Sequence, residues 1–159
     1  MNFIQLWGTV LLVILGLMTI LWLVSLLLRN SSIVDIFWGA GFLIADWAAF
    51  TLTPGGAPAR RTLIGVLVTL WGLRLALFIL WRNWGKPEDF RYQKWRKESG
   101  PIWWWKSFFQ VFLLQGVLMW LICAPLLAAN AGTASAGLTW LDFLGAAAWL
   151  IGFFFEAVG

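Results

Sequence analysis

The stretch Phe3–Leu28 reads FIQLWGTVLLVILGLMTILWLVSLLL and contains no Asp, Glu, Lys or Arg in 26 residues. A helix that crosses a bilayer needs about 20 predominantly apolar residues, so this stretch is long enough to span one. No basic residue precedes it, and the apolar run exceeds the roughly 7–15 residues of a signal-peptide core. The run is also continuous rather than alternating, which excludes a half-buried strand. It therefore predicts a transmembrane helix.

Four further apolar windows follow, at Ile33–Leu52, Thr62–Trp81, Ser107–Ala129 and Leu138–Val158. Hydrophobic residues make up 62% of the 159 residues, charged residues only 11%, and the mean hydropathy is +0.85. A soluble domain cannot bury that much apolar surface. We predict an all-α, polytopic membrane helix bundle with five transmembrane helices, forming a single integral membrane domain over residues 1–159 with the lipid bilayer as its main partner.

One loop, Arg82–Lys106, carries most of the charge. It holds seven basic and three acidic residues, a net charge of +4 that equals the net charge of the whole chain. The positive-inside rule makes this loop cytoplasmic, which places the N-terminus outside, in what we expect to be a bacterial inner membrane. We also expect a short helix in the loop, with Pro87 in its first turn and Ser99-Gly100-Pro101 ending it. Because the net positive charge lies in this loop between two membrane spans, nucleic acid is not an expected partner.

The chain contains no His and a single Cys, Cys123. This composition excludes a Ser-His-Asp triad, a zinc site of the H-E-x-x-H type and an internal disulfide. No metal site is expected.

Ionisable residues inside the apolar windows cost about 2.5–3.5 kcal/mol each at the bilayer centre, so each is a candidate functional residue. Asp35 has two open interpretations: a capping-box acid that follows Ser32 at the start of its helix, or a functional acid. Asp46 is expected to pair with a neighbouring polar group, and Asp142 to be an interface residue.

Glu156 ends a seam on the fifth window, where acidic, small and aromatic residues recur at steps of three and four: Asp142, Gly145, Trp149, Gly152 and Glu156. Such a seam predicts a face turned towards the bundle. Arg74, on one face with Trp71, is expected to pair with an inward acid or to reach the cytoplasmic surface. We expect Asp35, Glu156 and the basic loop to meet at the cytoplasmic level, around a pocket for a lipophilic substrate and an anionic cofactor.

Several motifs in fixed order are similar to one family. They are Asn30-Ser31-Ser32-Ile33-Val34-Asp35-Ile36-Phe37-Trp38-Gly39, Trp71-Gly72-Leu73-Arg74-Leu75, Glu88-Asp89-Phe90-Arg91-Tyr92, Phe108-Phe109-Gln110-Val111-Phe112-Leu113-Leu114-Gln115-Gly116 and Gly152-Phe153-Phe154-Phe155-Glu156. From about residue 8 onward, the chain resembles an uncharacterised bacterial branch of the steroid 5-alpha-reductase-like membrane proteins. The resemblance implies a full protein of about seven helices, with this chain truncated at its C-terminus.

The resemblance also implies an activity. Reductases of this kind use NADPH to reduce a carbon–carbon double bond conjugated to a ketone in a steroid- or isoprenoid-like substrate, with an acid and a tyrosine holding the ketone oxygen. Asp35 matches the acid, while Trp71 lies where the tyrosine is expected on the third helix, which also carries Arg74; we take these three as the catalytic candidates. The implied cofactor contacts are Arg82, Lys86, Arg91, Tyr92 and Glu156.

Two alternatives remain open. One is an S-adenosylmethionine-dependent membrane methyltransferase, like the related isoprenylcysteine carboxyl methyltransferases. The other is a non-catalytic membrane protein whose charges set topology and helix pairing. No glycine motif of the G-x-G-x-x-G or P-loop type occurs in the chain, so a soluble-type nucleotide fold is excluded.

Overall fold

The computed structural model describes residues 1–55, 57–132 and 137–158. Within these ranges the chain is helical and no residue lies in a strand. Five helical stretches among the described residues are long and apolar enough to cross a membrane. The prediction of an all-α membrane bundle is therefore confirmed.

The first two helices have the predicted bounds: α1 covers Phe3–Leu28 and α2 covers Ile33–Leu52. Helix α3, Pro58–Asn83, is longer than predicted at both ends. It starts earlier because Pro58 occupies the first turn, where its missing N–H costs no hydrogen bond. Helix α8 covers Trp140–Val158.

The fourth predicted span is an interrupted helical run. It consists of α5 (Trp103–Ser107), the π-helical segment η2 (Phe108–Leu113), α6 (Leu114–Ile122) and α7 (Ala124–Ala131). The run begins before the predicted Ser107, and it breaks at Cys123 because Pro125 follows in the first turn of α7.

The loop before this run contains the predicted short helix, α4 (Phe90–Ser99), followed by the 3-10 turn η1 (Gly100–Ile102). The prediction for its start is wrong, since Pro87 lies outside the helix. Instead Asp89 is the N-cap residue, and its side chain accepts a hydrogen bond from Arg91 N at 3.0 Å. The predicted end is confirmed: Gly100 has a φ of 56°, a backbone conformation that suits glycine and stops the helix.

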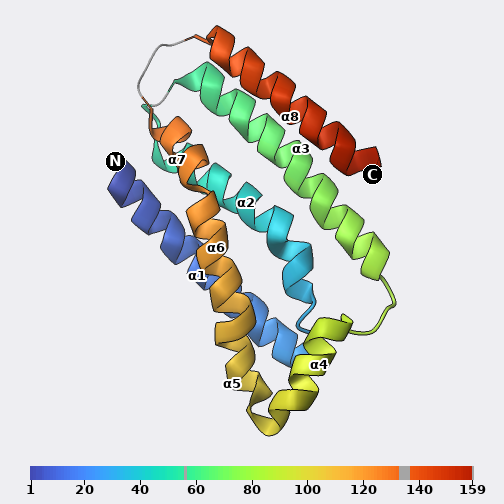
Figure 1. Ribbon diagram of the computed structural model, residues 1–159. Helices are drawn as coiled ribbons and strands as arrows, with labels where there is room; N and C mark the ends of the chain where they lie inside the picture. The colour runs from blue at the N-terminus through green and yellow to red at the C-terminus, as the bar shows by residue number, and fades with distance from the viewer. Residues whose placement is uncertain (56, 133–136, 159) are drawn as a thin grey trace.

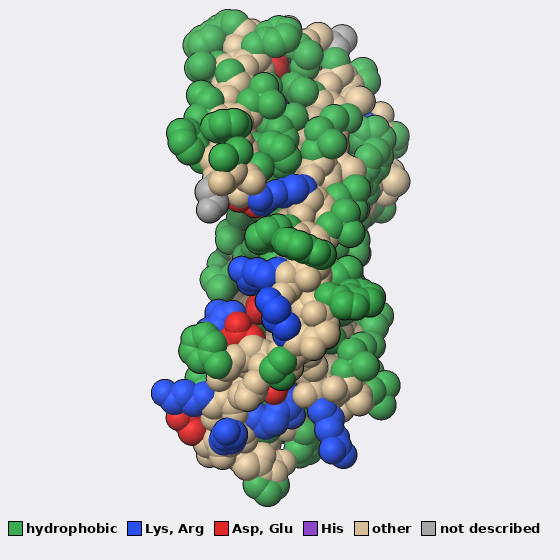
Figure 2. Space-filling model, turned by 90° about the vertical axis from the view of Figure 1, so that its right-hand side faces the viewer, with side chains coloured by type: hydrophobic (Ala, Val, Ile, Leu, Met, Phe, Trp, Pro, Cys, Tyr) green, Lys and Arg blue, Asp and Glu red, His purple; other side chains and the backbone are tan. Residues whose placement is uncertain are grey.

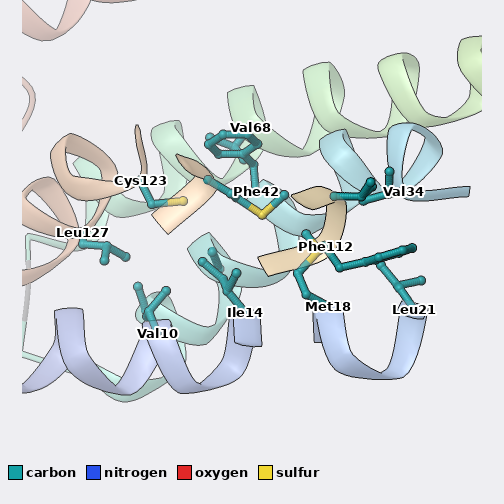
Figure 3. Close-up of a cluster of buried hydrophobic side chains, with 14 of the residues drawn as sticks. Val10, Ile14, Met18, Leu21, Val34, Phe42, Val68, Phe112, Cys123 and Leu127 are labelled. Carbon is teal, nitrogen blue, oxygen red and sulfur yellow. The ribbon is translucent and has the colours of Figure 1, made fainter. Parts of the chain in front are cut away.

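Helix α1 supplies one wall of the core (Figure 3). Its buried residues recur at steps of three and four and form a single stripe: Leu6, Val10, Ile14, Met18, Leu21 and Ser25. This stripe faces α2 and the run η2–α6–α7, while the opposite surface of α1 stays exposed. In a bilayer that exposed surface faces lipid.

Helices α2 and α3 approach each other most closely at Gly39 and Gly72. A Cβ atom on either glycine would collide with the backbone carbonyl oxygen of the other. Small residues of this kind let membrane helices pack backbone to backbone. Helix α8 is different: it lies beside α3 at the edge of the bundle (Figure 1), and none of its described residues is buried.

The segments that connect the helices at one end of the bundle carry most of its positive charge. We call this end, comprising Arg29 and residues 82–106, the basic end. It includes α4, which lies at the bottom of Figure 1, and Lys and Arg side chains gather over the lower half of the face shown in Figure 2. The structure thus brings the charged loop and the start of α2 to the same level.

Candidate functional site

The start of α2 is tied to the segment just before α4. Ser32 is the N-cap residue of α2, yet its side chain makes no cap hydrogen bond. Its hydroxyl instead accepts a hydrogen bond from Asp89 N at 2.7 Å. The capping-box interpretation of Asp35 is therefore wrong, because Ser32 makes no cap hydrogen bond and the Asp35 carboxylate accepts from side chains of α4.

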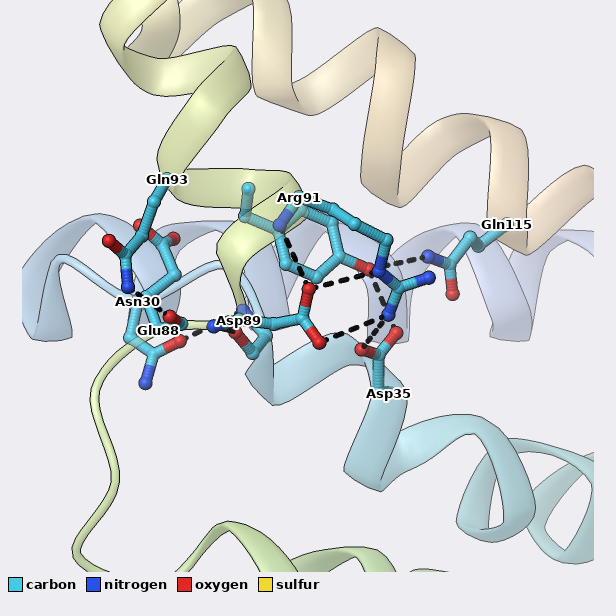
Figure 4. A network of polar contacts seen from close by, with 9 residues as sticks. Asn30, Asp35, Glu88, Asp89, Arg91, Gln93 and Gln115 are labelled. Atoms are coloured by element: carbon cyan, nitrogen blue, oxygen red, sulfur yellow. Dashed lines mark hydrogen bonds and ion pairs between the residues drawn. The ribbon is translucent and has the colours of Figure 1, made fainter.

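Asp35 binds two side chains from α4 (Figure 4). The hydroxyl of Tyr92, the single tyrosine of the chain, donates to Asp35 Oδ1 at 2.8 Å. A guanidinium nitrogen of Arg91 donates to Asp35 Oδ2 at 3.3 Å. The amide of Gln115, on α6, donates to the Tyr92 hydroxyl oxygen at 3.3 Å. Tyr92 is 2% exposed, so the phenol is held in place by packing as well as by hydrogen bonds.

Glu88 fixes the position of α4 against the start of α2. Its carboxylate accepts from Ser31 N at 2.6 Å and from two nitrogens of Arg96 at 2.8 and 3.0 Å. The Glu88 carbonyl oxygen accepts from the Gln93 amide. With its side chain only 8% exposed, Glu88 holds together the two segments that carry Asp35 and Tyr92.

Arg91 links Asp35 to Asp89. Its Nε donates to Asp89 Oδ1 at 2.9 Å, and this hydrogen bond holds the pKa of Asp89 below its ordinary value. The positive charge of Arg82 acts in the same direction on Asp89. The Arg91 side chain is 53% exposed, so part of its guanidinium remains free to meet an anion.

Lys86 lines a cavity of about 260 Å³ beside this network. The cavity lies between the start of α2 and the end of α3, and its polar lining includes Asn30, Ser32, Asn83 and Asp89. Of the predicted site residues, the structure thus brings Asp35, Arg82, Lys86, Arg91 and Tyr92 to the basic end.

Glu156 belongs to a second polar group, on the α3–α8 side of the bundle. Its carboxylate accepts from Arg74 at 2.7 Å and from Trp71 Nε1 at 2.8 Å, while a second Arg74 nitrogen donates to its carbonyl oxygen at 2.5 Å. Of the two alternatives expected for Arg74, the structure shows the ion pair with an acid. Glu156 was expected to meet Asp35 and the basic loop, but its carboxylate binds Arg74 and Trp71 instead. Trp71 therefore contacts Glu156, and the phenol that contacts Asp35 comes from α4 rather than α3.

Next to this second group lies a mostly apolar groove of about 510 Å³ between α2, α3, α7 and α8. Phe42, Trp71, Trp149, Gly152 and Glu156 are among its lining residues. The seam predicted on the fifth span does face the bundle, because Asp142, Gly145 and Trp149 line the adjoining groove.

A row of aromatic rings lies between the two polar groups. Trp38, one turn after Asp35, contacts Phe42 with ring centroids 5.6 Å apart. Phe42 in turn contacts Trp71 at 5.5 Å. The row leads from the turn that carries Asp35 to the apolar groove.

The other two acids have the structural partners that were predicted. Asp46 is fully buried and accepts from the Asn130 amide at 2.8 Å. Asp142 binds Arg60 through two hydrogen bonds, at 2.6 and 2.9 Å. Both pairs lie away from the basic end.

Sequence reasoning named neither Glu88 nor Gln115 as a candidate site residue. Gln115 carried a signal, since a polar amide in an apolar membrane segment needs a partner. Glu88 carried none, because an acid in a charged loop is ordinarily a solvated one.

The family model described as "Protein of unknown function (DUF1295)" matches residues 21–159. Neither the curated proteins nor the solved structures contain a match to the chain. The match spans most of the sequence and includes every candidate site residue. The chain belongs to this family.

Proposed function

We propose that this DUF1295 protein is an integral membrane oxidoreductase that uses NADPH to reduce a carbon–carbon double bond conjugated to a ketone. Its substrate would be lipophilic, of a steroid- or isoprenoid-like kind. The observation that carries the proposal is the hydrogen bond of 2.8 Å between the Tyr92 hydroxyl and Asp35. It brings an acid and a phenol together, the two groups that the resemblance to steroid 5-alpha-reductase-like proteins calls for, with the phenol on α4 in place of the third helix.

The carboxyl–phenol pair suits a ketone oxygen. When Asp35 carries a proton, the pair contains two O–H donors: one closes the Asp35–Tyr92 bond and the other is available to the substrate. Negative charge develops on the ketone oxygen as the conjugated carbon is reduced, and donors already aimed at that oxygen stabilise the transition state. Gln115 holds the Tyr92 oxygen at 3.3 Å, so the phenol is oriented before substrate binds.

The residues beside this pair fit an anionic dinucleotide. NADPH would supply the hydride. Lys86, Arg82 and the half-exposed Arg91 provide cations for its phosphates, and arginine binds phosphate through paired N–H donors. The cavity of about 260 Å³ is smaller than the roughly 300–1,000 Å³ of pockets for drug-sized ligands. These residues would therefore hold one part of the cofactor.

The apolar groove supports a lipophilic substrate. Its volume of about 510 Å³ lies within the range of small-molecule pockets, and the aromatic row Trp38–Phe42–Trp71 connects it to the turn that carries Asp35. Trp71 and Arg74 would then position α8 beside the substrate by binding Glu156. A cofactor contact by Glu156 itself stays a prediction.

The test compares Asp35→Asn and Tyr92→Phe, each made in the full-length protein, with the unaltered full-length protein in detergent. NADPH oxidation is followed with a 4-en-3-one steroid and with a linear isoprenoid enone. Tyr92→Phe removes an O–H donor, and loss of one donor to a developing oxyanion lowers kcat by about 100- to 1,000-fold. Asp35→Asn keeps N–H donors but removes the carboxyl proton, so turnover that depends on this proton should also fall. The melting temperatures of both variants should stay close to that of the parent.

Asp46→Asn is the matched control. It makes the same carboxyl-to-amide change on the same helix, but at a buried position bonded to Asn130, so it should lower the melting temperature and leave kcat nearly unchanged. Full turnover by Asp35→Asn or by Tyr92→Phe would refute the proposed role of the pair. Binding of S-adenosylmethionine instead of NADPH would favour a methyltransferase, and binding of neither would favour a non-catalytic protein.

A further inference from the structure

A second groove at the basic end is unrelated to the acid–phenol pair. It lies between the end of α1 and the α4–α5 turn and has a volume of about 680 Å³. Its lining combines two arginines with apolar and aromatic side chains: Leu26, Arg29, Arg96, Pro101, Trp103 and Trp104. The proposed reduction uses none of these residues.

Arg29 is the C-cap residue of α1 and has a left-handed backbone conformation, with φ 51°. This conformation favours glycine, because a Cβ atom clashes with the backbone there. Arg29 is exposed, and no described residue forms a hydrogen bond or ion pair with its guanidinium. The unpaired guanidinium of Arg29 thus lies at the groove, at a position where the backbone conformation would favour glycine.

Arg96 is held with one edge towards Glu88. Its Nε and one terminal nitrogen bind the two Glu88 oxygens at 3.0 and 2.8 Å, and its guanidinium lies 5.7 Å from the centre of the Trp103 ring. A guanidinium carries five N–H donors, so the other terminal nitrogen keeps its donors. The side chain is 33% exposed, which leaves that edge open to an anion.

Apolar side chains lie beside the two arginines. Leu23, one turn before Leu26, is 50% exposed, and Leu27 is 85% exposed. Trp104, 54% exposed, is anchored to α1 because its carbonyl oxygen accepts from Trp22 Nε1 at 2.9 Å. The groove therefore combines two arginine side chains with a neighbouring apolar surface. It lies at the end of α1, a helix that is long and apolar enough to cross a membrane.

We infer that this groove binds an anionic phospholipid, with the phosphate between Arg29 and Arg96 and the acyl chains along α1. Basic pockets between membrane helices are suited to acidic headgroups. The apolar flank argues for a lipid rather than a free phosphate, since a soluble anion would gain nothing from Leu23, Leu27 or Trp104. The single unpaired charge of Arg29 argues for an anionic lipid over a zwitterionic one.

The experiment measures lipid binding by native mass spectrometry, titrating the purified protein with phosphatidylglycerol and with phosphatidylcholine of the same acyl chains. Arg29→Gly removes the guanidinium and also relieves the left-handed backbone, so the variant should fold. We expect it to weaken phosphatidylglycerol binding about fivefold, the effect of one basic residue near an anionic lipid. Phosphatidylcholine binding should not change.

Lys94→Ala is the control of equal charge. Lys94 lies on α4 with its side chain 71% exposed and does not line the groove, so its loss should change binding less than about twofold. Equal phosphatidylglycerol affinity for the parent and Arg29→Gly would overturn the inference. So would displacement of the lipid by glycerol phosphate at similar concentration, which would show a simple anion site. Neither outcome depends on enzyme activity.

Discussion

Helix α3 is held by α2 on one side and by α8 on the other, and the two interfaces differ in how closely the helix backbones pack. Against α2, backbone meets backbone at Gly39 and Gly72. Against α8, the contact rests on ion pairs at two levels, Arg60–Asp142 and Arg74–Glu156, with grooves between the helices. Lipid gives helices little hydrophobic reason to associate, so close packing and polar bonds must do it. Here one helix shows both solutions side by side.

The glycine interface should be the more sensitive of the two. Gly72→Val places a Cβ atom 2.6 Å from the Gly39 carbonyl oxygen, so α2 and α3 must separate. Overpacking of this kind costs about 1–3 kcal/mol or more, and we expect a large fall in melting temperature, measured by tryptophan fluorescence in detergent. Gly152→Ala on α8, where an added Cβ meets nothing within 4 Å, should leave the melting temperature unchanged. If the two variants are equally stable, close packing is not what distinguishes the interfaces.

Loss of one ion pair between α3 and α8 should destabilise only the nearby part of α8. Glu156→Gln removes the charge that binds Arg74, and interhelical polar bonds in membranes contribute about 0.6–1.7 kcal/mol. We expect faster hydrogen exchange in α8, measured by mass spectrometry over residues 140–158, with little change in α2.

Asp142→Asn makes the same change at the other level of α8. Each single variant should loosen mainly its own end, and the double variant should release the whole helix. Exchange that spreads into α2 in either single variant would mean that α8 is part of the main cooperative unit.

Acid should affect a third contact more weakly, that of α4 with α2. Because Arg91 holds the pKa of Asp89 below its ordinary value, ionised Asp89 stabilises the folded state fully above about pH 4, its unfolded value. That contribution is lost as the pH falls through the lower folded pKa. We expect the amides of α4 to be less protected from hydrogen exchange at pH 3 than at pH 7 once each rate is divided by the intrinsic exchange rate at that pH. The amides at the glycine contact, which has no titratable group, should keep their protection.

Asp89→Asn keeps the N-cap oxygen but removes the titration. The difference in α4 protection between the two pH values should therefore shrink in this variant. An undiminished difference would assign the acid sensitivity to another group.

The sequence predicted the fold in detail because membrane spans depend on local composition. Phe3–Leu28 and Ile33–Leu52 were found to the residue since charged or turn residues bound each apolar run. Pro87 misled the prediction for α4, because proline is compatible with the residues before a helix as well as with its first turn.

The candidate site was less predictable because its bonds join distant segments. Asp35 and Tyr92 are 57 residues apart, and no periodicity within one helix reports such a contact. Ser32 before Asp35 matched a capping signal, but tertiary partners displaced it: Ser32 binds Asp89 N and Asp35 binds Tyr92. A capping motif describes the bonds that a segment would form by itself. Here Glu88 and Arg96 hold α4 close to the start of α2, so Ser32 and Asp35 bond to that part of the chain instead.

The π-helical segment Phe108–Leu113 absorbs one extra residue within the long helical run. Each residue of an α-helix turns the chain by about 100°, and a π turn takes up one residue more than an α turn. Deleting a single residue from this segment would let the run close up as a regular α-helix, and the parts before and after it would keep nearly the same rotation relative to each other. Deleting a residue from α5 instead would turn Trp103 relative to Gln115 by about 100°. Gln115 and Trp103 serve the same end of the molecule, so the π-helical segment is a place where the run can lose a residue and still keep these two side chains in register.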